Sequence, residues 1–83
     1  MSAHEIQQFI YQNGIFTFTD GKRNEGMIVC RYNIREAQIE YYMISAENVM
    51  AYQAARSQAE MDAHKKLGEM IDIGNITNAQ LFN

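Results

Sequence analysis

The chain has 83 residues, 47% of them hydrophobic, and carries 7 lysines and arginines against 10 aspartates and glutamates, for a formal net charge of −3. One cysteine, Cys30, and no Cys/His cluster at zinc spacing exclude a disulfide scaffold and a metal-nucleated fold, while the acidic balance weighs against nucleic-acid binding driven by bulk electrostatics. The length predicts one domain over residues 1–83, and without a long apolar stretch or secretory segment we expect a cytoplasmic protein with no membrane span.

The first segment has the pattern of an amphipathic helix. Ser2 is followed three residues later by Glu5, the spacing at which the two side chains cap the start of a helix. Apolar residues then recur at helical spacing up to Asn13-Gly14, a pair that favours a left-handed stop. The sequence therefore predicts a helix over residues 3–12.

Residues 15–52 have the pattern of a β-sheet. Apolar and polar residues alternate over 15–19, and two further β-rich runs follow at 27–32 and 38–44. The connections between these runs are too short for a parallel crossover, which predicts antiparallel hairpins. Residues 49–52 fit either a short fourth strand or the first turn of a helix.

The last third of the chain favours helix. Residues 53–70 are rich in strong helix formers and contain no breaker before Gly68, which predicts a long helix. In the tail, 71–83, capping-box spacing over residues 77–80 predicts a short helical turn that docks Phe82. The expected fold class is α+β: an N-terminal helix, a bent antiparallel sheet of three or four strands, and a longer C-terminal helix.

The first hairpin resembles a known motif. Residues 18–28 contain an apolar strand, Asp20-Gly21, four polar residues, Gly26 and a second apolar strand. This segment is similar to the first sequence motif of Sm-like small β-barrels, which include a branch of bacterial RNA chaperones, and SH3-like barrels share the pattern. The resemblance covers residues 3 to about 52 and implies a helix followed by a strongly bent five-stranded sheet.

The chain departs from the Sm-like pattern at two places. Tyr32 stands where the family has an aspartate, and Met43 follows Tyr42 where the bacterial branch has a basic pair that binds RNA. RNA binding through that pair therefore does not carry over to this chain.

The distribution of apolar residues predicts a subunit interface. A domain of this size without disulfides or metal sites has a small core. The third strand carries apolar residues on both faces, and a sheet of only three or four strands cannot bury all of them. The residues predicted at the interface are Tyr42, Ile44, Met50 and Met61. The leading hypothesis is a non-enzymatic interaction or oligomerisation module, with a homodimer as the first choice and another protein as a possible partner.

The alternative that the resemblance implies is an Sm-like RNA-binding ring. In that case four basic residues would contact the nucleic-acid backbone: Lys22, Arg23, Arg31 and Arg35. The tyrosines of the strands, together with Tyr52, would stack on bases.

The sequence offers no set of catalytic residues. Glu60 and His64 are four residues apart on the predicted helix, but two ligands do not make a metal site, and a solvated helix face explains them more simply. Cys30 alternates with apolar residues in a strand and has no base near it in the sequence. We therefore expect no enzyme activity, no metal and no cofactor.

Overall fold

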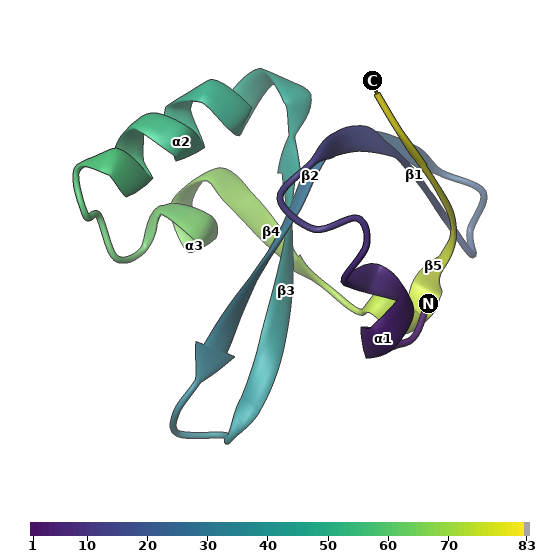
Figure 1. The fold of residues 1–83 in the computed structure, drawn as a ribbon, viewed down its shortest axis with the longest axis horizontal. Helices are drawn as coiled ribbons and strands as arrows, with labels where there is room; N and C mark the ends of the chain where they lie inside the picture. Colours follow the sequence, from purple (N-terminus) through teal and green to yellow (C-terminus); the bar gives the residue numbers. More distant parts are fainter. Residues whose placement is uncertain (83) are drawn as a thin grey trace.

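The computed structural model describes residues 1–82, which form one five-stranded antiparallel sheet with the strand order β4-β3-β2-β1-β5 (Figure 1). In chain order the elements are α1 (Ala3–Ile6), β1 (Asn13–Phe18), β2 (Arg23–Asn33), β3 (Gln38–Ser45), η1 (Ala46–Asn48), α2 (Val49–Ser57), α3 (Ala63–Leu67), β4 (Gly68–Ile71), η2 (Ile73–Asn75) and β5 (Ile76–Leu81). Figure 1 shows α2 and α3 on one side of the long β2–β3 hairpin and α1 on the other, beside β5.

The N-terminal helix starts where the sequence predicts but is shorter than residues 3–12. The capping box is present: the Glu5 N–H donates to Ser2 Oγ at 3.2 Å, and the Ser2 N–H donates to Glu5 Oε1 at 3.0 Å. The helix ends at Ile6, and a turn over residues 7–11 follows, which closes at Tyr11 with a left-handed backbone of φ 61°. The Tyr11 N–H donates to a carbonyl oxygen of β2 at 2.8 Å, a bond that a continuous helix would not allow.

The three central strands form the predicted antiparallel hairpins. The long strand β2 pairs with β1 through its first half and with β3 from Gly26 onward, so Gly26 is opposite Gly14 on one side and Ser45 on the other. Gly26 has a φ of 157°, and a Cβ built there would collide with the carbonyl oxygen of Ile44. Glycine is therefore required where β2 passes between its two neighbours.

The predicted helix over residues 53–70 is wrong: α2, α3 and β4 replace it. The break comes at Ala59, which is left-handed with φ 58°. The Glu60 N–H donates back to the Ala55 carbonyl oxygen at 3.0 Å and closes the end of α2. Gly68 then begins β4, which pairs with β3. Strong helix propensity favoured one continuous helix, but the pairing of β4 with the sheet overrides that local preference.

Two further expectations are resolved in the C-terminal half. Residues 49–52 form the first turn of α2, so they are helix and not a fourth strand. The predicted helical turn in the tail is wrong, since β5 pairs with β1 there and the Phe82 N–H extends the ladder to the Asn13 carbonyl oxygen at 3.0 Å. Thr77 does not cap a helix; its hydroxyl donates to the Thr17 carbonyl oxygen of β1 at 3.2 Å. The sheet consequently has five strands, not three or four.

Alternation of side chains along the strands gives the sheet a buried cluster on each face. The cluster beneath α2 and α3 contains Met27, Val29, Tyr42, Ile44, Val49, Tyr52 and Ala63. The cluster on the α1 side contains Ile6, Phe16, Ile28, Met43 and Ile76. Both apolar faces of the sheet are therefore covered by segments of the same chain.

Candidate functional site

The four residues predicted at a subunit interface do not share one surface. Tyr42 and Ile44 are buried in the cluster beneath α2 and α3, so they present no surface to a partner. The reason is that the second apolar face of the sheet is covered by helices of its own chain. Met50 and Met61 are 82% and 71% exposed, but they line different hollows, one beside α2 and the other at the turn between α2 and α3.

The four basic residues assigned to nucleic acid are also dispersed. Lys22 and Arg23 lie where β2 begins, and Arg35 lies in the turn beyond its other end. Arg31 is on β2 between them and shares a cleft with Tyr52, one of the tyrosines expected to stack on bases. The fold therefore separates these four residues into three places: the start of β2, its second half and the turn after it.

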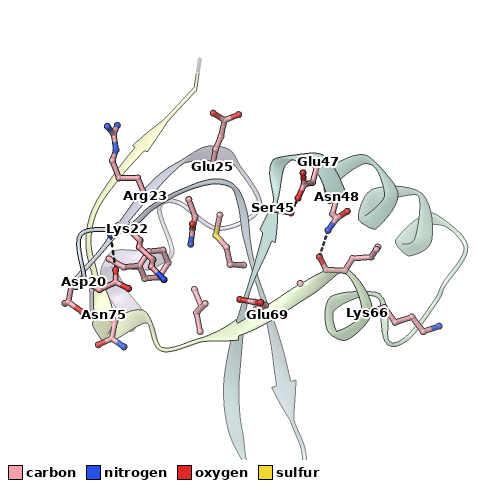
Figure 2. A pocket seen from close by; sticks show the side chains of 17 residues that line it. Asp20, Lys22, Arg23, Glu25, Ser45, Glu47, Asn48, Lys66, Glu69 and Asn75 are labelled. Atoms are coloured by element: carbon pink, nitrogen blue, oxygen red, sulfur yellow. Dashed lines mark hydrogen bonds between the residues drawn. The ribbon is translucent and has the colours of Figure 1, made fainter.

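A large hollow lies between the β1–β2 turn and the segment that runs from β3 to β4 (Figure 2). It has a volume of about 780 Å³, and its charged residues are Asp20, Lys22, Arg23, Glu25, Glu47, Lys66 and Glu69. On its far wall Asn48 Nδ2 donates to the Leu67 carbonyl oxygen at 3.3 Å. Since three cations and four carboxylates line it together, the hollow offers no uniform field to a ligand of either sign.

A smaller cleft, which we call the Arg31–Arg56 cleft, opens where β2 faces α2 and α3. It has a volume of about 310 Å³. The lining residues that bear on its chemistry are Tyr11, Arg31, Tyr52, Arg56, Glu60 and His64. Perturbed ionisable groups gathered in one cavity are a physical sign of a binding site, and two members of this set have shifted pKa values.

Arg56 is held in this cleft by two aromatic rings. Its guanidinium carbon lies 5.1 Å from the centroid of the Tyr11 ring and 6.0 Å from that of Tyr52, within the range of cation–π attraction. The Tyr11 hydroxyl donates to the Cys30 carbonyl oxygen at 2.9 Å, which fixes the ring against β2. Partial burial raises the pKa of Tyr11, so this hydroxyl stays protonated and remains a donor at neutral pH.

Arg31 is held from the opposite wall. Its Nη1 donates to the carbonyl oxygen of Met61, in the turn between α2 and α3, at 2.8 Å. Glu60 also lines the cleft, but its carboxylate is paired with Lys66 Nζ at 2.9 Å, and this is the one ion pair among residues 1–82. Neither Arg31 nor Arg56 forms an ion pair within the described chain, although Glu40 lies opposite Arg31 on the neighbouring strand β3.

His64 forms part of the cleft wall and is a buried residue, not a solvated one as the sequence suggested. It is 4% exposed and packs edge to face on Tyr42, with ring centroids 4.7 Å apart. Its Nε2 has no hydrogen-bond partner among the described residues. Burial lowers the pKa of His64 below its usual 6.5, and Arg31 and Lys65 lower it further against the smaller opposing effects of Asp62 and Glu40.

This burial predicts a loss of stability in mild acid. Because the pKa of His64 is lower in the folded chain than in the unfolded chain, unfolding takes up a proton once the pH falls below about 6.5. The contribution of His64 to the free energy of unfolding should be constant above that pH and fall below it by up to ~1.4 kcal/mol per pH unit. Thermal denaturation of wild type and His64→Leu between about pH 7.5 and 5.5 measures it.

The His64→Leu variant should show a flatter dependence of melting temperature on pH than the wild type. His4→Gln, which removes the exposed histidine of α1, is the matched control. Equal slopes in wild type and His64→Leu would show that His64 does not couple protonation to folding.

Sequence reasoning named Arg31, Tyr52, Glu60 and His64 separately but missed Tyr11, Arg56 and the grouping of these residues in one cleft. Tyr52 and Arg56 are four residues apart, so the helical spacing that places them on one face of α2 was available as a signal. No local signal pointed to Tyr11, because it reaches the cleft through a left-handed turn, a conformation that tyrosine seldom adopts.

No family model, curated protein or solved structure matches this chain. Over residues 1–82, no three or more His, Cys, Asp or Glu side chains are grouped so as to hold a metal ion. The same residues include no helix with the length and apolar content needed to cross a membrane.

Proposed function

We propose that the chain is a non-enzymatic interaction module of the cytoplasm that self-associates through the outer edge of β5, as a dimer in which β5 of one copy pairs with β5 of another. The observation that carries this proposal is an open strand edge without any charge on it. A reducing compartment fits Cys30, which is a free thiol.

The outer edge of β5 lacks charge and proline, two of the usual protections against pairing; its one irregularity is a register shift near its start, between the pairs Thr17–Asn78 and Phe18–Ile76. β5 bonds to β1 on its inner side and ends the sheet on the other. Its start is covered, since the Met1 amino group donates to the Ile76 carbonyl oxygen at 2.9 Å. The open part, Thr77–Leu81, contains no charged residue and no proline, which are the common devices that keep sheet edges apart.

The other edge of the sheet is better protected. β4 has four residues and carries the charge of Glu69 on an exposed side chain, and a short charged edge is a poor template for another strand. In a dimer with a two-fold axis, the unprotected β5 edge of one copy pairs with the same edge of the other copy. Phe82, directly after β5, and Met50 line one hollow and add exposed apolar surface at that end of the strand.

Two lysines on β5 should convert the dimer to a monomer. Asn78 and Gln80 are exposed and two residues apart, so Asn78→Lys/Gln80→Lys places both charges on one face of the strand. In a β5–β5 pair the lysines of the two copies meet and repel each other. Light scattering on a gel-filtration column measures the mass, and circular dichroism confirms that the variant is folded.

Met70→Lys on β4 is the matched control. It adds one lysine to the opposite edge of the sheet, and the dimer proposal expects its mass to equal that of the wild type. A wild-type chain that is folded and monomeric at all concentrations would contradict the proposal, and so would a double-lysine variant that keeps the dimer mass.

The second candidate is an Sm-like RNA-binding ring, in which β4 of each copy pairs with β5 of the next. A short helix followed by a bent five-stranded sheet supports it, because this is the arrangement that the resemblance implies, and so does the position of β4 and β5 at opposite edges. A head-to-tail contact of this kind closes into a ring when the rotation between neighbouring copies divides a full turn. Lys22, Arg23, Arg31 and Arg35 would then contact RNA.

The same measurements separate the two assemblies. A ring has several times the monomer mass, is broken by Met70→Lys as well as by the double-lysine variant, and binds RNA more weakly as salt increases. If Arg31→Ala/Arg35→Ala bound RNA as tightly as wild type, the basic residues named here would not be its contacts.

A further inference from the structure

We propose that the Arg31–Arg56 cleft binds the phosphate group of a small molecule, either inorganic phosphate or a phosphate monoester. This inference is independent of the β5 dimer, because the residues that carry it lie on β2, on α2 and in the turns before β1 and after α2.

The charges of the cleft select an anion. Arg31 and Arg56 line it together, and neither forms an ion pair within residues 1–82. Glu40 lies opposite Arg31 on β3, but its carboxylate oxygens accept hydrogen bonds from Asn33 Nδ2 and the Tyr42 hydroxyl. The carboxylate of Glu60, which would otherwise repel an anion, is engaged by Lys66 at 2.9 Å. Guanidinium groups present several N–H donors in a planar fork, a geometry that matches the oxygens of phosphate.

The cleft is organised before any ligand arrives. Arg31 is held by the Met61 carbonyl oxygen at 2.8 Å, and Arg56 is stacked on two tyrosine rings. Tyr11 is itself held through its N–H at 2.8 Å and its hydroxyl at 2.9 Å, both bonded to β2. Its left-handed backbone, with φ 61°, is the kind of local strain that proteins retain at binding sites. Side chains fixed in advance lose little freedom on binding, which favours affinity.

The size of the cleft favours a small ligand. A volume of about 310 Å³ is at the low end of small-molecule sites. Two guanidiniums suit the two negative charges of a phosphate or a phosphate monoester. The tyrosine rings form an apolar wall beside them, against which the organic part of a monoester can lie.

Titration of the protein with phosphate compounds, followed by NMR, tests the proposal. The probes are inorganic phosphate, adenosine monophosphate and adenosine, each added at a constant ionic strength set with sodium chloride. We expect both phosphate compounds to shift the ring resonances of Tyr11 and His64 in a saturable way, and adenosine alone to leave them in place. Tighter binding of the monophosphate identifies an organic monoester as the ligand class; equal affinities identify phosphate itself.

Arg56→Gln should weaken phosphate binding at least about tenfold, because it removes a charged hydrogen-bond donor from the ligand. The matched control is Arg35→Gln, which removes the same charge from an exposed turn and should change the affinity by less than about twofold. Since Arg56 packs on two rings, Arg56→Lys is the second variant: it keeps the charge and the stem and should weaken binding by an intermediate factor.

Either of two results would overturn the proposal. One is a set of Tyr11 and His64 resonances that do not move with phosphate beyond their response to sodium chloride. The other is an equal loss of affinity in Arg35→Gln and Arg56→Gln, which would show a general attraction to a charged surface in place of a defined site.

Discussion

Replacing Gly26 with alanine is expected to lower the free energy of unfolding by ~2–5 kcal/mol, the sum of a strained backbone and a steric clash inside the sheet. The added methyl group would collide with the Ile44 carbonyl oxygen of β3 and approach the Ala46 N at 3.0 Å. These are backbone atoms, so a change of side-chain rotamer cannot relieve the contact. The β2–β3 pairing would have to open where the two hairpins share a residue.

Gly21→Ala is the matched control for this prediction. Gly21 also has a positive φ, 85°, but nothing lies within 4 Å of the position that a Cβ would take. It should therefore show the backbone strain alone, about 1–2 kcal/mol. Urea denaturation of both variants measures the difference. Equal losses of stability would mean that the steric clash with β3 adds nothing to the destabilisation caused by Gly26→Ala.

Phe16→Ala is expected to destabilise the fold by about 3–5 kcal/mol. Phe16 is 0% exposed and belongs to the cluster on the α1 side of the sheet, where it meets residues from β2, β3 and β5. A chain of this length is typically stable by only ~4–12 kcal/mol, so the variant should lose a large share of its stability.

Phe82→Ala removes the same atoms from a side chain that is 49% exposed and should have a clearly smaller effect. Denaturant titration followed by circular dichroism compares the two variants. A Phe16→Ala loss no greater than that of Phe82→Ala would contradict the position of Phe16 at the centre of this cluster.

The first half of the fold could be predicted because its signals are local. The capping box at Ser2, the alternating strands and the glycines around the first hairpin each depend on residues close in sequence, and the structure contains them. The second half depends on long-range pairing. β4 and β5 occupy segments with helical composition or capping spacing, and only the free edges of β3 and β1 make them strands.

The interface prediction for Tyr42 and Ile44 was wrong for a related reason. It assumed that three or four strands and one helix could not cover the second face of the sheet. The single long helix expected from the composition is in fact two short helices, and the break at Ala59 places α3 where it packs on β3. The Arg31–Arg56 cleft forms between these two helices and β2. A prediction of one unbroken helix therefore cannot locate it.

The pairing of β1 with β5 has a consequence for how the chain is made. Thr17 pairs with Asn78, so the backbone N–H and C=O groups on the outer edge of β1 have no partner until β5 has been synthesised. During synthesis the hairpins β1–β2 and β2–β3 can form early, but β1 emerges from the ribosome as an exposed edge and stays so until the whole domain has followed. Contacts this distant in sequence slow folding because a long loop must close first. The nascent chain is therefore prone to aggregation along the outer edge of β1 until β5 has emerged, and shielding by a chaperone should matter most in that interval.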